Sequence, residues 1–213
     1  MKDRRVEANP VDPAIHGTQA RKVELEERNV FLQFSMIVRI MDECRDGWEL
    51  TPGLVKMFHR LAVRGIYRCA GQYRKGGVAI RGSPHKPLGW AYVDGLVAEM
   101  CDKVNASDDW SPVKTAAYLL WRLSWIHPFS GGNGRTSRAV CHLVLCKRLG
   151  FLLPGKPTIA EQIDANRARY QAALEDADAA SKDGVIDVSQ METLLEEFLK
   201  VQLSEPDCDT SPE

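Results

Sequence analysis

The residues best suited to chemistry in this sequence lie in one stretch, His127 to Arg138, which reads HPFSGGNGRTSR. A histidine side chain ordinarily titrates near neutral pH, so His127 is the candidate proton acceptor of the stretch. Arg135 and Arg138 are three residues apart, and on a helix that spacing places them on one face. Two neighbouring guanidinium groups suit the oxygens of a di- or triphosphate. The stretch therefore predicts a site that binds a polyphosphate beside a general base.

Two apolar runs, residues 116–126 and 139–149, flank this stretch, which indicates a tight loop between two helices. Pro128 and the glycines end the first helix. Glycine adopts positive φ readily, and such residues in succession point their backbone N–H groups into one anion-binding concavity. The dipole at the start of the second helix adds to this attraction. We expect this nest of N–H groups to be formed by Gly131, Gly132 and Gly134.

The stretch resembles the signature of the Fic family (filamentation induced by cAMP), H-P-F-x-D/E-G-N-G-R-x-x-R. One position departs from it, because Gly131 stands where the family has Asp or Glu. The resemblance continues in residues 54–60, which are similar to a family helix, and in residues 70–74, which are similar to its G-x-Y/F-R segment. The fold that this implies is an all-α, Fic-type bundle of about seven to eight helices with one β-hairpin flap.

The activity that the resemblance implies is protein nucleotidyl transfer, or AMPylation. ATP is the donor, AMP moves to a hydroxyl side chain of a target protein, and pyrophosphate leaves. His127 is then the catalytic base. The residues implied to bind the phosphates are Ser130, Gly131, Gly132, Asn133, Gly134, Arg135 and Arg138.

The glycine at position 131 changes what is expected of the metal. In the family the acid at this position holds Mg²⁺, and a carboxylate is the usual protein anchor for Mg²⁺ beside phosphates. Glycine offers only its carbonyl. We therefore expect no metal ligand from the protein, with Mg²⁺ or Mn²⁺ carried by the nucleotide, and an activity that is weakened rather than lost.

Residues 76–82 are β-prone and bounded by glycines, which predicts a β-hairpin. In Fic proteins this position is the flap, and the resemblance implies that Val78, Ala79 and Ile80 pair edge to edge with the backbone of the target protein. Such strand addition reads little sequence, so it does not identify the target. An ordinary surface hairpin is the alternative. His85, in the following loop, is either a second titrating group near the site or a solvated loop residue.

A capping box at Thr158 and Glu161 predicts a helix that runs to about residue 180. In related Fic proteins this helix and the turn after it border the adenine pocket. Asp178 departs from a more usual Asn, which leaves the choice of base open, and Tyr170 is explained equally well by core packing. The residues at the corresponding places are Tyr170, Gln171 and Asp178.

Many Fic proteins carry an inhibitory motif, S/T-x-x-x-E-G/N, whose Glu pairs with the second arginine of the signature, here Arg138. The sequence has no full match to this motif. Glu27 lies at an N-terminal place that suits it, but Val23 precedes it by four residues. Glu197 has the spacing from Thr193 near the C-terminus but lacks the residue that should follow. Each is a candidate inhibitory residue, and a solvated helix charge is the alternative.

Apolar periodicity predicts further helices at residues 20–44, 52–63, 91–104 and 188–203, and no internal repeat or second domain is evident. We divide the chain into a flexible N-terminal arm, a single Fic domain and a disordered acidic tail. These three parts cover residues 1–18, 19–203 and 204–213.

The composition limits which classes of partner and which compartment we expect for the protein. A net charge of −1 over 213 residues argues against a generally basic nucleic-acid surface. Apolar runs do not reach membrane length, and no apolar signal segment is seen. Scattered cysteines without a C-x-x-C pair, three of them in apolar helices, fit reduced core residues and a reducing compartment. We expect a cytoplasmic protein, or an effector delivered without a visible signal, that binds a nucleotide and a target protein and is compatible with an oligomer.

Two alternatives keep the fold and change the function. Gly131 and Asp178 leave room for another donor or reaction, such as UTP, CDP-choline or phosphate transfer. A catalytically impaired module that binds a nucleotide or a partner is the non-enzymatic alternative. The intact His127 and both arginines argue against such decay.

Overall fold

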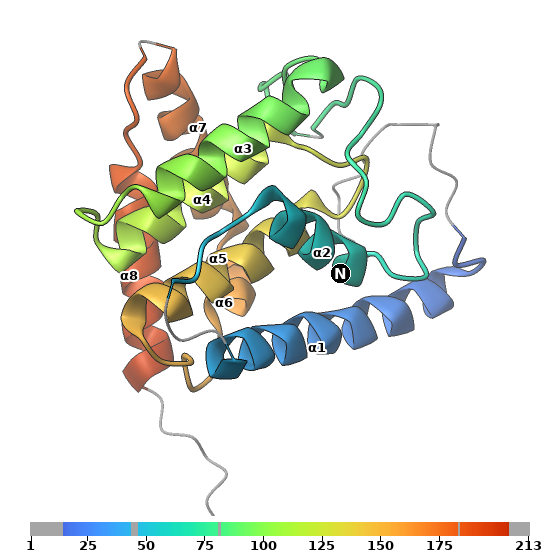
Figure 1. Cartoon of the computed structure of the whole chain (residues 1–213), viewed down its shortest axis with the longest axis horizontal. Coiled ribbons are helices and arrows are strands. Elements are labelled where there is room, and N and C mark those ends of the chain that lie inside the picture. The colour runs from blue at the N-terminus through green and yellow to red at the C-terminus, as the bar shows by residue number, and fades with distance from the viewer. Residues whose placement is uncertain (1–14, 44–46, 81, 183, 205–213) are drawn as a thin grey trace, which may run out of the picture.

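The computed structural model describes residues 15–43, 47–80, 82–182 and 184–204. These residues contain eight α-helices and a short 3-10 helix (Figure 1). The all-α prediction and the expected number of helices are confirmed. The helices are α1 (Gln19–Glu43), α2 (Pro52–Ala62), η1 (Trp90–Tyr92), α3 (Val93–Asn105), α4 (Pro112–Ile126), α5 (Asn133–Leu149), α6 (Ile159–Ala165), α7 (Arg167–Ser181) and α8 (Ser189–Ser204).

Helices α4 and α5 form the centre of the bundle and share its most extensive helix–helix contact. Helix α4 is apolar around most of its circumference, so it can be buried on several sides at once, and it also contacts α3, α7 and α8. Helix α5 packs in addition against α1, α2 and α6. The predicted pair of central helices is confirmed, and the loop between them carries residues 127–132.

The predicted helix starts are confirmed where a capping side chain is present. Thr51 and Ser111 each accept a backbone N–H of the first turn and are followed by proline. Thr158 and Glu161 form the expected capping box. The helix predicted from there to about residue 180 is instead two helices, α6 and α7. It breaks at Asn166, whose backbone N–H and side chain both donate to the Gln162 carbonyl.

The β-hairpin predicted over residues 76–82 is not present, because the described residues of this segment contain no strand. The segment is extended, and its side chains alternate between half-buried and exposed, as they would in a strand. Its backbone, however, is held by side chains from elsewhere in the fold rather than by a second strand. Val78 and Ile80 are half-buried and Ala79 is exposed.

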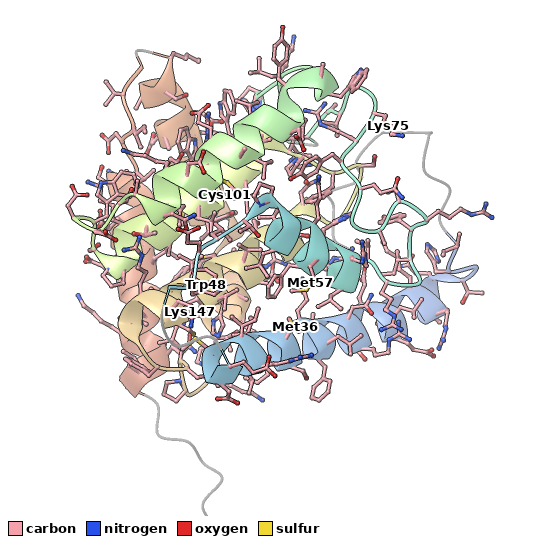
Figure 2. All side chains as sticks on the ribbon, in the orientation of Figure 1. Met36, Trp48, Met57, Lys75, Cys101 and Lys147 are labelled. Carbon is pink, nitrogen blue, oxygen red and sulfur yellow. The ribbon has the colours of Figure 1, made fainter. Side chains whose placement is uncertain are left out.

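Helix α1 is joined to α2 by buried polar side chains as well as by apolar contacts. Asn29 donates to the carbonyls of Ala62 and Arg64, and Gln33 donates to the carbonyl of Phe58. These two amides satisfy carbonyls at and after the end of α2 that lie away from water. They fix which face of α1 points inward, and Met36 and Met57 pack against the core from the two helices (Figure 2).

Cys101, Cys141 and Cys146 are buried and unbridged, as predicted for reduced core residues (Figure 2 labels Cys101). None of the helices in the described part of the chain is long and apolar enough to cross a membrane. The predicted N-terminal arm falls mostly, and the acidic tail almost wholly, outside the described residues.

His59 of α2 is fully buried and is bonded to the loop that follows α4. Its Nε2 donates to the carbonyl of Gly131 at 2.8 Å, and its Nδ1 accepts the backbone N–H of Gly71 at 2.9 Å. The imidazole ring stacks on Phe129 with centroids 3.7 Å apart. The pKa of His59 is lowered to about 4, mainly by burial; the hydrogen bond to Gly131 opposes this shift and the positive charge of Arg135 adds to it. The ring is therefore neutral in the folded protein.

We predict that His59 makes the protein less stable in mild acid. In the unfolded chain the group titrates near its ordinary pKa of about 6.5, so between pH 6.5 and about 4 the unfolded state binds more protons. The free energy of unfolding should fall by about 3 kcal/mol over this window. Urea unfolding of the wild type and of His59→Gln across that range measures it. The variant should lack this part of the pH dependence; identical slopes, or an NMR titration of the ring near pH 6.5, would contradict the assignment.

Candidate active site

His127 terminates α4 and has a left-handed backbone conformation, with φ 48°, as the C-cap residue. Such a conformation is uncommon outside glycine and clusters at functional positions. The backbone N–H of His127 donates to the Leu123 carbonyl, and its side-chain Nδ1 lies 3.4 Å from the Ser124 carbonyl. Because a carbonyl can only accept, this contact puts the ring proton on Nδ1 and the lone pair on Nε2. His127 is thus held in the tautomer that a proton acceptor at Nε2 requires.

Arg74 holds the end of α4 in place beside the site. Its guanidinium is buried and donates to the carbonyls of Ile126 and His127, with 2.8 Å from Nε to the His127 oxygen. The same group donates to the carbonyl of Gly76, at the start of the extended segment, and to that of Leu88, in the loop after it. A cation at the negative end of a helix is electrostatically favourable. One buried side chain therefore positions His127 and the predicted flap relative to each other.

His85 caps the same helix end from the outer side. Its Nε2 donates to the Trp125 carbonyl at 2.8 Å, and its Nδ1 lies 3.8 Å from Asp178 of α7. Asp178 also accepts a hydrogen bond of 2.9 Å from the indole N–H of Trp121. Burial raises the pKa of Asp178, and the hydrogen bond from Trp121 opposes that rise. Of the two readings for His85, the structure supports a residue that is engaged near the site rather than solvated.

The loop after His127 is held closed by Asn133. The side chain of Asn133 accepts the backbone N–H of Phe129 and donates to its carbonyl, at 3.0 and 2.8 Å. Of the three glycines in the predicted nest, only Gly132 has positive φ, at 78°. A Cβ at Gly132 would lie 2.4 Å from Val63, so no larger residue fits there. The loop is thus shaped by one left-handed glycine and an asparagine clamp, not by three successive left-handed glycines.

Helix α5 begins at Asn133, so its positive end lies within the motif. Ser130 and Gly134 are half-buried beside this end. Arg135 contacts Glu26 of α1 at 3.2 Å, and Arg138 lies 3.6 Å from Asp164 of α6. Both arginine side chains are mostly buried, and their guanidinium groups reach carboxylates on other helices.

The three residues expected near the adenine of the nucleotide differ in where they lie. Tyr170 is 2% exposed and lies in the core, with its hydroxyl 3.4 Å from Ser124 of α4. Gln171 is exposed and donates to the carbonyl of Gly82 in the extended segment. Asp178 is bonded to Trp121 as described above. Helix α7 therefore holds the extended segment through Gln171 and the following loop through Asp178, while Tyr170 packs as a core residue.

The two candidate inhibitory glutamates lie on α1 and α8. Glu27 is exposed, and the carboxylate that reaches the motif is its neighbour Glu26. Glu197 of α8 forms an ion pair of 2.6 Å with Arg169 of α7.

The residues around the motif do not fit a metal held by the protein. No cluster of three or more His, Cys, Asp or Glu side chains with metal-binding geometry occurs among the described residues. Position 131 offers no carboxylate, and its carbonyl already accepts the hydrogen bond from His59. A cation at this site would need its ligands from the nucleotide and from water.

Four residues that position the site have weaker sequence signals than the motif. Glu26 precedes Asn29 and Gln33 on α1, and the three-to-four-residue spacing of those buried amides could have indicated its inward direction. Arg74 lies in a segment already similar to the family pattern. His59 and His85 act through backbone carbonyls far away in sequence, which no local pattern reveals.

The comparisons with known proteins agree with the motif and with the fold. The model of the Fic/DOC family matches residues 49–145. The protein adenylyltransferase fic-1 of Caenorhabditis briggsae is 33% identical over 90 residues, which are 41% of this chain and 16% of that protein. The chain thus spans a small part of that relative.

Solved structures with this fold include a Fic domain signalling protein from Bacteroides thetaiotaomicron. Its TM-score is 0.70 at 22% identity, over 88% of this chain and 72% of that one. The BepC protein of Bartonella tribocorum, solved with bound AMPPNP, has a TM-score of 0.59 at 16% identity, over 87% and 90% of the two chains. The motif and the family model together identify a Fic/DOC domain at residues 49–145, and the chain shares its fold with solved Fic proteins.

Proposed function

We propose that the protein is a Fic-type nucleotidyltransferase that moves AMP from ATP to a hydroxyl side chain of a target protein. The observation that carries the proposal is the placement of His127. Its ring is held with the lone pair on Nε2, directly before the positive end of α5 and its two arginines. A base beside an anion-binding helix start is the arrangement that phosphoryl-group chemistry needs. The similarity to an adenylyltransferase and to a fold solved with AMPPNP supports the choice of ATP.

In this mechanism the triphosphate lies across the start of α5, with its negative charge toward Arg135 and Arg138. His127 Nε2 accepts the proton of the target hydroxyl as its oxygen attacks the α-phosphorus. The new O–P bond forms while the bond from the α-phosphorus to the bridging oxygen breaks, and pyrophosphate carries that electron pair away. Catalysis is then mostly positioning and charge stabilisation by the protein.

The extended segment is the proposed docking edge for the target. Its backbone is not paired with a second strand in the described residues, and Val78, Ala79 and Ile80 alternate between half-buried and exposed positions. A target segment could therefore add beside it as a strand. Arg74 joins the start of the segment and the loop after it to the carbonyl of His127, which keeps a docked hydroxyl near the base.

A second candidate function rests on the observation at position 131. Without a carboxylate there, and with its carbonyl bonded to His59, the site could bind a nucleotide and turn it over slowly, or use a donor other than ATP. Asp178, which lies beside His85 in the loop after the extended segment, leaves the choice of nucleotide base open in the same way.

We predict that His127→Ala abolishes labelling of target proteins. The test is incubation with α-labelled ATP, Mg²⁺ or Mn²⁺ and a cell lysate, and loss of a general base should lower the rate by about 100-fold or more. His16→Ala is the matched control, because His16 lies outside the motif and bonds only locally to Thr18. A labelled band that persists in His127→Ala contradicts the proposal. A band seen only with another labelled nucleotide would show that this nucleotide, and not ATP, is the donor.

Gly131→Asp should raise the transfer rate by at least about tenfold, because it restores a carboxylate that can hold Mg²⁺ beside the phosphates. Gly131 does not have positive φ, so the backbone accepts a side chain. Gly131→Asn is the matched control of equal size without the charge. Steady-state labelling with both variants, alongside ATP binding, measures the effect. Equal rates in the Asp and Asn variants at unchanged ATP affinity would show that Gly131 is not the limiting defect.

Glu26→Gln should tighten nucleotide binding by roughly three- to tenfold. Its carboxylate lies 3.2 Å from Arg135 and competes with phosphate for that guanidinium, and an ion pair of this exposure is worth about 1 kcal/mol or less. Calorimetric titration with a non-hydrolysable ATP analogue measures it. Glu27→Gln, on the adjacent exposed glutamate, separates the two candidates, and a larger effect there would assign the inhibitory role to Glu27.

A further inference from the structure

The basic residues of this chain are concentrated around the extended segment that we propose as the docking edge. Residues 50–93 contain eight of the 28 Lys and Arg side chains and none of the 29 Asp and Glu side chains. The whole chain has a net charge of only −1, so this stretch is strongly positive and the remainder of the chain is acidic. A local excess of one charge beside a proposed binding edge indicates a partner of the opposite charge.

Five of these basic side chains are exposed and have no carboxylate partner in the part of the chain that the structure describes. We call them the unpaired basic residues, and they are Arg60, Arg64, Arg68, Lys75 and Lys86. Exposed arginines elsewhere do have such partners, since Arg39 of α1 and Arg169 of α7 lie 2.9 and 2.6 Å from a carboxylate. The positive charges near the extended segment are therefore not neutralised within the described fold.

Lys75 and Lys86 lie near the same end of the extended segment, although they are eleven positions apart in sequence. Arg74 donates to the carbonyls of Gly76 and Leu88 at 3.0 and 2.6 Å, so the chain just after each lysine meets one guanidinium. The Nε of that guanidinium donates to the carbonyl of the candidate base at 2.8 Å. The two lysines, of which Figure 2 labels Lys75, therefore lie where the docking edge approaches the candidate base.

The backbone beside these lysines is open to a peptide strand. Within the described chain, the backbone groups of Val78 and Ala79 form no hydrogen bond, and Ile80 accepts one from the backbone N–H of Ser83. A row of free N–H and C=O groups at strand spacing is matched by the backbone of another peptide. The phosphates and bases of a nucleic acid do not offer donors and acceptors in that alternation, so the edge favours a protein partner.

The surface that follows Lys86 is apolar. Leu88, Trp90 and Tyr92 are 44%, 52% and 65% exposed. Aromatic side chains supply much of the binding energy at protein interfaces, whereas charges at the rim select the partner and speed its approach. A target segment that mixes acidic and apolar side chains matches both parts of this surface.

We propose that this surface selects target segments that carry Asp or Glu beside the hydroxyl to be modified. The unpaired basic residues attract such a segment and pair with its carboxylates, while the open backbone of the extended segment binds it as a strand. Strand addition by itself reads little sequence, so the charges supply the selectivity that the edge lacks. The proposal rests on the proposed transferase function for the transfer step, but its binding step is tested without a nucleotide.

The first test measures, by fluorescence anisotropy, the binding of two fluorescein-labelled peptides to the full chain. Both peptides are β-prone and contain one tyrosine, and they carry either Glu or Lys at the same flanking positions. The wild type should bind the Glu peptide at least about tenfold more tightly in about 50 mM salt, and less selectively in about 500 mM salt, where exposed charges are screened. Lys75→Glu/Lys86→Glu should reverse the preference. Lys156→Glu/Lys200→Glu, the same charge change at two other exposed lysines, should keep it.

Three outcomes of this test overturn the proposal. The first is equal affinity of the wild type for the two peptides, or a preference that Lys75→Glu/Lys86→Glu leaves unchanged. The second is an equal loss of preference in both double variants, because net charge rather than this surface would then explain the binding. The third is a single-stranded RNA that binds more tightly than the Glu peptide through the same lysines, which would assign the surface to nucleic acid.

The second test separates docking from transfer, by steady-state labelling of the Glu peptide with α-labelled ATP. Lys75→Glu/Lys86→Glu should raise KM for the peptide by at least about tenfold and change kcat by less than about twofold, because these lysines bind the target away from the reacting atoms. A lower kcat at unchanged KM contradicts the docking role. If no label is transferred from any nucleotide while the first test gives the expected preference, the transferase proposal fails and the docking surface stands.

Discussion

The carbonyl oxygens at the end of α4 are the constraint on which the candidate site depends. A helix leaves its last carbonyls without intrahelical donors, and inside a bundle water cannot reach them freely. Here each one has a donor, from the backbone of His127 to Leu123, from its ring to Ser124, from His85 to Trp125 and from Arg74 to Ile126. The helix can therefore end in the interior, and the residue at that end is the candidate base.

Arg74 suits this task because a guanidinium carries five donors in a fixed plane and keeps its charge when buried. It donates two hydrogen bonds to carbonyls at the end of α4. It donates two more to the carbonyl of Gly76, where the extended segment starts, and to that of Leu88, after the segment. The distance between the base and the docking edge is thus set by one rigid group rather than by the loop itself. A lysine could neutralise the same helix end but could not reach all four carbonyls.

The helices could be predicted from the sequence because their signals are local. Ser or Thr before proline marks a helix start, and apolar spacing marks the buried face, as at Ser111 and along α4. The hairpin could not be predicted correctly, because the hydrogen-bond partners of its backbone are side chains and not a second strand. Arg74, just before the segment, donates to Gly76, and Gln171 of α7 donates to Gly82. The signature likewise identified His127 and both arginines, whereas His59 acts through a carbonyl 72 residues away.

The charges of the site are distributed differently from what the signature alone suggests. The one position where the pattern has an acid is a glycine, yet each arginine already lies near a carboxylate from another helix, Glu26 of α1 and Asp164 of α6. The two carboxylates are 30% and 44% exposed and can be displaced by a triphosphate, since its charge is larger and α5 adds its dipole. Binding a nucleotide would then release both carboxylates. Because Glu26 is on α1 and Asp164 is on α6, these two helices would respond to that change first.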